Sequence, residues 1–180
     1  IPSKDRIEIE TAISIGNLDW DGHNITYTHS DGAGVYGVAQ ARNRLVDKAL
    51  EGGYDYLLMI DADMIVPEDT IIHLLDPPVP IVTGCARYKN ESRRTPLFKA
   101  TQDSEGSNAW KWDDIPPGRF EIESGGVACA MIDVNLFRQF DRPWFVWQER
   151  NDGTYCGEDI GWYDRLHQAG IRTYADGRVI

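Results

Sequence analysis

Two carboxylates follow an apolar run in the middle of the chain. Residues 54–64 read YDYLLMIDADM, so Asp61 and Asp63 come directly after apolar residues. Such a run is typical of a buried strand in a parallel sheet, and open α/β sheets bind ligands beyond the carboxyl ends of their strands. Residues two apart in an extended segment face the same side. We expect Asp61 and Asp63 to bind a hard divalent cation that bridges to phosphate oxygens. The alternative is an acidic turn after a strand.

A second acidic pair, Glu158 and Asp159, begins a predicted helix directly after Gly157. Acidic residues in a first helical turn complement the helix dipole, which needs no catalytic role. One of these carboxylates could instead be a general base that removes a proton from an acceptor hydroxyl. The local sequence leaves both interpretations open.

Four polar residues are candidates for holding a nucleotide. Ser3 and Asp31 follow predicted strands, so both should lie at the sheet edge that carries Asp61, where an acid can accept from a nucleobase or a ribose hydroxyl. Arg42 can reach a base or a phosphate, and Asn43 lies beside it. Each could instead be a turn former or a solvated helix residue.

Two tryptophans, Trp110 and Trp112, lie in a polar stretch. Exposed aromatic faces pack against the C–H surfaces of sugar rings. We therefore consider both residues as candidates for contact with an acceptor.

The elements that must position these residues follow from hydrophobic periodicity and turn chemistry. The spacing of Ile9, Ala12 and Ile13 predicts the first of five helices, over 6–18, 38–50, 67–75, 134–140 and 158–169. Strands are expected over 24–29, 54–64, 79–84, 123–133 and 171–174. Strands that alternate with helices predict a doubly wound α/β fold with a mostly parallel sheet. Residues 86–121 break the pattern, and we expect a loop there that serves as a lid or lines the acceptor side.

Length and composition describe one globular domain over residues 1–180. The net charge of −11 argues against nucleic acid as a partner. The cysteines, Cys85, Cys129 and Cys156, form no CxxC pair, so we expect reduced thiols in a cytoplasmic protein. No apolar run approaches the roughly 20 residues of a membrane span.

Taken in order, these motifs resemble those of the GT-A glycosyltransferases, nearest to the family 2-like group. The matching segments are IPSKDR at 1–6, SDG at 30–32, ARN at 41–43, IDAD at 60–63, SGG at 124–126 and GED at 157–159. The resemblance implies a Rossmann-like three-layer sandwich with a mostly parallel central sheet. It also implies a UDP- or GDP-linked sugar donor, a Mn²⁺ or Mg²⁺ ion, a hydroxyl acceptor on a glycan or other molecule, and a place in polysaccharide biosynthesis.

The resemblance also assigns roles to the candidate residues. Ser3, Asp31 and Arg42 would hold the nucleoside, and Asp61 and Asp63 would bind the metal and the diphosphate. Gly125 and Gly126 would let the backbone approach the donor sugar or acceptor. Asp159 would be the base of an inverting enzyme, with Glu158 beside it as a supporting or acceptor-binding group.

The resemblance further implies what lies at the two ends. The family's first strand would come just before Ile1, and a further metal-binding histidine would follow Ile180, so we expect a chain that lacks both. The Gln-x-x-Arg-Trp signature of processive synthases is missing, which favours transfer of a single sugar.

Two other readings compete. Haloacid-dehalogenase-like phosphohydrolases also place DxD after a buried strand; Asp61 would then be the nucleophile and Asp63 the acid/base, with Asp159 and Asp164 near magnesium. That motif normally ends the first strand, whereas two βα-like segments precede it here. The non-enzymatic alternative is a domain that binds a nucleotide or glycan without turnover.

Overall fold

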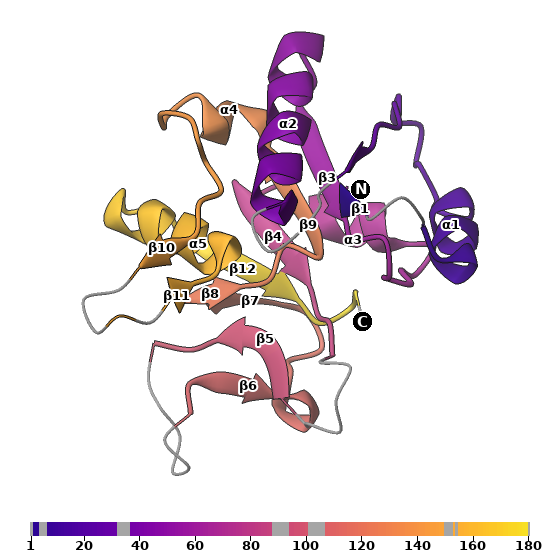
Figure 1. The fold of residues 1–180 in the computed structure, drawn as a ribbon. Coiled ribbons are helices and arrows are strands. Elements are labelled where there is room, and N and C mark those ends of the chain that lie inside the picture. The colour runs from indigo at the N-terminus through magenta and orange to yellow at the C-terminus, as the bar shows by residue number, and fades with distance from the viewer. Residues whose placement is uncertain are drawn as a thin grey trace.

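The computed structural model describes residues 2–3, 7–31, 37–87, 94–100, 107–149, 153 and 155–179. Five α-helices and one short 3₁₀ helix lie within these residues: α1 (Ile9–Gly16), α2 (Gly37–Gly52), α3 (Thr70–Leu75), η1 (Trp112–Asp114), α4 (Val134–Phe137) and α5 (Glu158–Gln168). Figure 1 shows α1 and α5 at opposite ends of the molecule, with the main sheet between them.

The main sheet has five strands in the order β3-β9-β4-β12-β7. They are β3 (Tyr56–Ile60), β4 (Ile81–Gly84), β7 (Arg119–Ile122), β9 (Cys129–Asp133) and β12 (Thr173–Asp176). Strand β9 is antiparallel to both β3 and β4, β12 is antiparallel to β7, and the β4–β12 pair is parallel. The expected Rossmann-like GT-A sandwich with a mostly parallel sheet is therefore wrong. Continuous apolar runs are typical of parallel strands because both faces are covered, but an antiparallel strand covered on both faces has the same pattern, so the insertion of β9 was not foreseen.

The strand directions nevertheless bring the predicted motifs to one edge. Strands β3, β4 and β12 run the same way, so their carboxyl ends share an edge, and the antiparallel β9 begins at that edge. The amide of Asp61 donates to the carbonyl of Ala128 over 2.8 Å, which ties the end of β3 to the residue before β9. The end of β3 is thereby held beside the segment that leads from Gly125–Gly126 into β9.

Three small sheets complete the fold. The first is the parallel pair β1 (Pro2–Ser3) and β2 (Ser30–Asp31), the second is the antiparallel pair β10 (Gln148–Glu149) and β11 (Tyr155–Cys156), and the third has the order β6-β5-β8. The third consists of β5 (Arg94–Phe98), β6 (Ala109–Lys111) and β8 (Ser124–Gly125). The described part of 86–121 thus contains β5, β6, η1 and the start of β7 rather than an irregular loop. Its role as a lid or as the acceptor side of the site stays a prediction.

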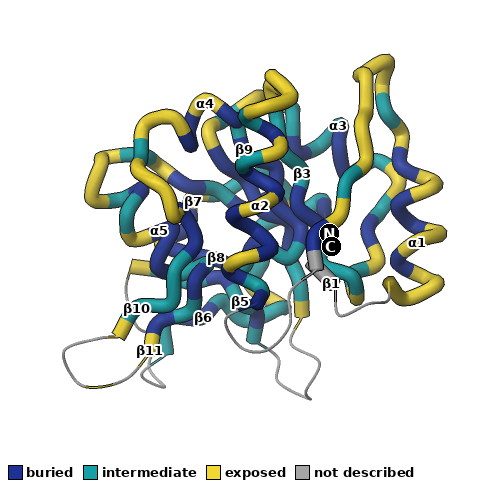
Figure 2. Tube along the Cα trace, turned by 45° about the horizontal axis from the view of Figure 1, so that its top comes forward, coloured by how far each residue is buried: buried dark blue, intermediate teal, exposed yellow. Residues whose placement is uncertain are grey.

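Helix α2 confirms its predicted span, because Ala41, Leu45 and Ala49 are buried at successive turns. Helix α1 forms where it was predicted, but its buried face differs. Ile9 and Ile13 are 73% and 57% exposed, whereas Thr11 and Ile15 are buried. Figure 2 shows exposed residues along the outer side of α1. The predicted strand over 24–29 is absent from the described residues, since β2 begins at Ser30.

Strand β3 is an edge strand of the main sheet within the described residues, because it pairs with β9 alone. A cavity of about 930 Å³ lies beside it, lined by β3, by residues 22–28 and by the C-terminal end of α2. Exposed Ile25, Tyr27 and Tyr54 are among the lining residues. This side of the sheet is therefore apolar and only partly covered.

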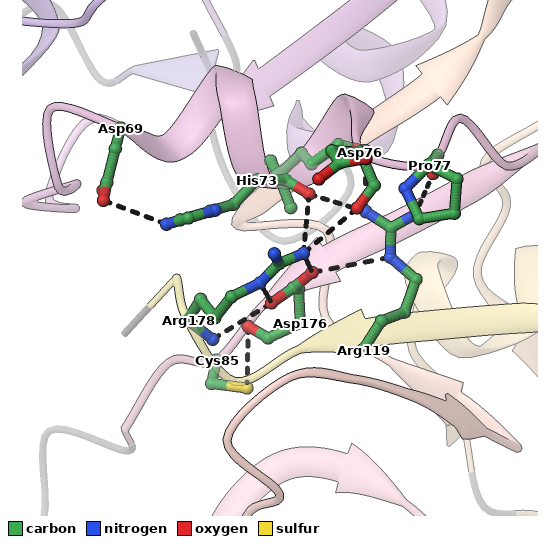
Figure 3. A network of polar contacts seen from close by, with 9 residues as sticks. Asp69, His73, Asp76, Pro77, Cys85, Arg119, Asp176 and Arg178 are labelled. Carbon is green, nitrogen blue, oxygen red and sulfur yellow. Dashed lines mark hydrogen bonds and ion pairs between the residues drawn. The ribbon is translucent and has the colours of Figure 1, made fainter.

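A buried carboxylate joins the end of β12 to α3. Asp176 is fully buried and pairs with two arginines: Arg178 Nη2 lies 2.7 Å and Arg119 Nε lies 3.4 Å from its Oδ2 (Figure 3). The same guanidinium groups donate to backbone carbonyls at the C-terminal end of α3, including His73 and Asp76. The His73 carbonyl also accepts from the Asp76 amide over 3.4 Å. Carbonyls in and just after the last turn of a helix lack the full set of helical partners, so the two arginines add donors there and fix α3 on the sheet.

Candidate functional site

Three distant segments place four charged side chains together. Arg42 comes from α2, Asp61 follows β3, and Glu158 and Asp159 begin α5. The Arg42 guanidinium donates to Glu158 Oε1 and lies 3.3 Å from both carboxylate oxygens of Asp61. The side chains of Arg42 and Glu158 are 5% and 7% exposed. Arg42 is therefore a buried link between the two acidic motifs that were identified separately in the sequence.

Burial and mutual repulsion act on the carboxylates of this site. Burial raises the pKa of Asp61, Arg42 opposes that rise, and Asp63 and Asp159 add to it. Burial likewise raises the pKa of Glu158, with Arg42 lowering it and Asp159 and Asp61 raising it. The described groups that act on the Asp61 carboxylate are one cation, Arg42, and two further carboxylates, Asp63 and Asp159, so negative charge exceeds positive charge there. A further positive charge would relieve this repulsion.

The Asp159 carboxylate lies near Gly126 of the SGG motif. Its Oδ1 accepts from the amide of Ile160 over 2.8 Å. Its Oδ2 would lie 3.9 Å from a Cβ atom added at Gly126. A Cβ at Gly157 would come within 2.7 Å of Asp159 Oδ1, so the residue before α5 must be small for this carboxylate to keep its place.

The two glycines of the SGG motif have different surroundings. A Cβ at Gly125 would come within 3.0 to 3.4 Å of Ile122, Leu97 and Thr83, so Gly125 permits close packing inside the protein. Gly126 has only ordinary contacts, and its carbonyl accepts from the Thr83 hydroxyl over 2.8 Å. Gly126 is therefore the better candidate for contact with a ligand. Its hydroxyl partner Thr83 was missed in the sequence, although it ends the apolar run of β4.

The Asp61-Ala62-Asp63 segment is a turn rather than an extended strand. The amide of Met64 donates to the carbonyl of Asp61 over 3.2 Å, which closes the turn. Asp61 is partly buried, whereas Asp63 is exposed. The prediction that this segment is extended is therefore wrong. No group of three or more His, Cys, Asp or Glu side chains suited to a metal ion occurs among the described residues.

The donor chemistry of this turn still suits a hard cation. Asp61 and Asp63 supply carboxylate oxygens, and the surplus of negative charge around Asp61 favours a cation there. Two carboxylates leave most positions around Mn²⁺ or Mg²⁺ for phosphate oxygens and water, as is usual for nucleotide-bound magnesium.

The remaining nucleotide candidates fall into two groups. Ser3 and Asp31 are register partners in the parallel β1–β2 pair, and their side chains lie outside the described residues. Among the described residues this pair is a sheet separate from the one that contains β3, so the predicted position at the sheet edge of Asp61 is not confirmed. Asn43 is structural. Its amide group donates to the carbonyls of Ala39 and Phe145, and its Oδ1 accepts from the amides of Trp144 and Phe145. These four bonds leave Asn43 no capacity for a nucleotide.

The two candidate acceptor tryptophans already have cationic neighbours. Lys99 Nζ lies 4.2 Å from the ring centroid of Trp110, and Arg87 Cζ lies 4.1 Å from that of Trp112. Both indoles are half-buried against the core. A sugar ring would have to displace these cations to stack on the same faces.

Comparisons with known proteins bear on the fold. No protein-family model and no curated protein sequence matches this chain. A solved structure with a similar fold is the crystal structure of A197 from STIV, with a TM-score of 0.67 and 19% sequence identity. The match covers 99% of this chain and 80% of that chain. At this identity the similarity shows the fold alone.

Among the described residues, no helix is both long enough and apolar enough to cross a lipid bilayer.

Proposed function

We propose that the chain is a metal-dependent glycosyltransferase that moves one sugar from a nucleotide-diphosphate sugar to a hydroxyl acceptor. The observation that supports this proposal is the convergence of Arg42, Asp61 and the Glu158–Asp159 pair beside Gly126 at one sheet edge. Arg42, Asp61, the Glu158–Asp159 pair and Gly126 come from four different motifs of the glycosyltransferase resemblance, and nothing local in the sequence requires these motifs to meet.

In this proposal the DxD turn binds the leaving group. Asp61 and Asp63 would hold Mn²⁺ or Mg²⁺, which when bound neutralises charge on the departing diphosphate. Arg42 holds Asp61 and Glu158 in place through its two hydrogen-bonded contacts. Glu158 therefore positions Arg42 instead of acting as the base.

Asp159 is the proposed base of an inverting transfer. Its Oδ2 lies on the side of Gly126, where the acceptor would bind. The acceptor oxygen attacks the anomeric carbon, the bond from that carbon to the diphosphate oxygen breaks, and the hydroxyl proton passes to Asp159. The nucleotide diphosphate leaves with the bonding electron pair.

The phosphohydrolase reading has weaker support. Both carboxylate oxygens of Asp61 face Arg42, and β1, α1, β2 and α2 precede β3 in the chain. A phosphoryl group trapped on Asp61 would reverse this preference. A domain that binds without turnover would give ligand stabilisation but no release of nucleotide diphosphate.

A thermal-shift screen tests the proposed function. UDP-glucose, UDP-N-acetylglucosamine, UDP-galactose and GDP-mannose are each added with and without Mn²⁺. A ligand at 100 times its Kd stabilises by about 2.7 kcal/mol, which corresponds to a Tm rise of about 5–10 °C. The same screen is run on Asp61→Asn, which removes one carboxylate of the proposed metal site. Its matched control is Asp164→Asn, because Asp164 is an exposed carboxylate on α5. If none of these compounds raises Tm and none is turned over, the proposal fails for these donor classes.

A further inference from the structure

Gly126 is held at both of its backbone polar groups. Its amide donates to the carbonyl of Pro96 on β5 over 2.9 Å, and its carbonyl accepts from the Thr83 hydroxyl of β4 over 2.8 Å. Thr83 is buried, and β8, which leads into Gly126, lies between β5 and α5 (Figure 1). Gly126 itself is only half-buried. Its backbone is therefore fixed from two sides and still partly accessible to solvent.

A space for about one carbon atom lies over Gly126. A Cβ atom added there would lie 3.7 Å from Cβ and Cγ of Pro96 and 3.9 Å from Oδ2 of Asp159. These are ordinary van der Waals distances, so one more carbon fits without displacing either neighbour. One side of the space is an apolar ring, and another is a carboxylate that accepts hydrogen bonds. Pro96 and Asp159 are both half-buried, so the space lies at the surface of the protein.

The course of β5 explains why the Pro96 ring faces this space. Thr95 and Leu97 are buried, whereas Pro96 between them is half-buried, so its ring lies on the other side of the strand. The register of β5 on β6 shifts between Arg94 and Phe98. Pro96, which has no N–H to donate, thus lies in an irregular part of the ladder, where proline is tolerated. Bulges, which produce shifts of this kind, are over-represented beside active sites and redirect side chains there.

We propose that Gly126, Pro96 and Asp159 form the subsite for the acceptor carbon that bears the attacking hydroxyl. The carbon packs against the Pro96 ring and the Gly126 backbone, and its hydroxyl donates to Asp159 Oδ2. Pro96 is then a specificity-determining residue, and Thr83 is a positioning residue that holds the Gly126 carbonyl without touching the substrate. The consequence for transfer rests on the proposed function, but the binding of an alcohol in this space does not.

Gly126→Ala fills the space with a methyl group. The backbone of Gly126 is outside the left-handed region, so alanine brings no strain. Glycerol and methyl β-D-glucopyranoside are titrated into ¹⁵N-labelled protein, and the amide signals of Gly126 and Asp159 are followed by NMR. Both signals should shift and saturate in the unmodified protein, and we expect binding about tenfold or more weaker in Gly126→Ala. Gly118→Ala is the matched control, because a Cβ atom there meets nothing within 4 Å.

Two substitutions of Thr83 test the positioning role. Thr83→Val keeps the shape of the side chain but leaves the Gly126 carbonyl without its hydroxyl donor, whereas Thr83→Ser keeps the donor. We expect Thr83→Val to weaken binding of both alcohols and to speed hydrogen exchange at the Gly126 amide. Thr83→Ser should restore both properties. Alcohol binding that is the same in Thr83→Val and the unmodified protein would remove Thr83 from this role.

Activity separates this inference from the proposed function. With any sugar nucleotide that the protein turns over, transfer to the two alcohols is compared with hydrolysis by water, which needs no room for a carbon. The ratio of transfer to hydrolysis should fall about tenfold or more in Gly126→Ala, through a higher KM for the alcohol. Thr83→Val should raise the same KM, an effect that a loss of stability alone would not confine to the alcohol.

The outcomes are distinct. If neither alcohol shifts the Gly126 signal, or if Gly126→Ala binds both as tightly as the unmodified protein, the inference is overturned. If the sugar nucleotide is turned over but Gly126→Ala keeps the same ratio of transfer to hydrolysis, the subsite fails and the proposed function stands. If the alcohols bind as expected but no sugar nucleotide is turned over, the subsite stands and the glycosyltransferase proposal fails.

Discussion

Arg42 and Glu158 lie 116 positions apart in the chain and form a buried ion pair that joins α2 to the first turn of α5. The same guanidinium reaches Asp61, so one arginine sets the relative positions of three elements. A buried pair of this kind is costly to break, because the remaining partner keeps an uncompensated charge away from water.

Arg42→Met should therefore destabilise the protein strongly. We expect a loss of about 3–5 kcal/mol in the free energy of unfolding, measured by urea denaturation at neutral pH. Adding Glu158→Leu in the same chain should recover part of the loss, since both charges are then gone. A double variant that is as unstable as the sum of the two single variants would argue against the pairing.

Asp61→Asn should abolish the effect of Mn²⁺ on ligand stabilisation and leave the fold intact. The amide retains the shape of the side chain, and removing the charge relieves the repulsion with Asp63 and Asp159. The measurement is Tm with a binding sugar nucleotide, with and without Mn²⁺, in parallel with Asp164→Asn. Full metal-dependent stabilisation in Asp61→Asn would remove Asp61 from the metal site.

Asp159→Asn should preserve donor binding and lower transfer about 100- to 10,000-fold, the usual contribution of a general base. Donor binding is followed by thermal shift and transfer by release of the nucleotide diphosphate. Loss of donor binding in this variant would argue against a base role and in favour of a donor-binding role.

Asp176 should make stability depend on acid pH. Burial alone would raise the pKa of Asp176, but hydrogen bonds from Arg178 and the charges of Arg178 and Arg119 outweigh burial and lower it. Its contribution is therefore complete above the unfolded pKa of about 3.9 and disappears as pH falls through the lower folded value. The stability difference between the unmodified protein and Asp176→Asn should be constant above about pH 5 and shrink below about pH 4. Urea unfolding at several pH values measures it, and a difference that does not change with pH would contradict the assignment.

Cys85 and Cys129 should resist alkylation in the folded protein. Both are buried free thiols, and burial is the main reason why the pKa of each rises to about 12. At pH 8 the reactive thiolate is then a minor species. Iodoacetamide labelling followed by peptide mass spectrometry should show slow modification at both positions, and rapid modification in urea. Fast labelling of either residue under native conditions would show that its surroundings open readily.

The predictable parts of the fold are those in which local pattern and packing agree. Ala41, Leu45 and Ala49 mark the buried face of α2 correctly, since a regular apolar stripe leaves few alternatives. Ile9 and Ile13 mark the wrong face of α1, because periodicity shows which residues share a face but not what covers it. The antiparallel course of β9 depends on contacts between segments far apart in the chain, which no local pattern records.

In the candidate site, too, local patterns identified individual residues but not the contacts between distant segments. Asp61, Glu158 and Asp159 were identified by residue type and position after a strand or before a helix. The link between Asp61 and Glu158 through Arg42 was not predicted, because it depends on how α2 and α5 pack.

The position of β9 between β3 and β4 affects the order in which the protein can fold. During synthesis, the apolar residues of β3 and β4 emerge long before residues 129–133, which later pair with both strands. Non-local pairing of this kind slows folding and prolongs the exposure of unpaired strands. The nascent chain therefore passes through a stage in which its future sheet centre is open to other chains. Asp61 acquires its bond to the Ala128 carbonyl only after that stage ends, so the site forms late.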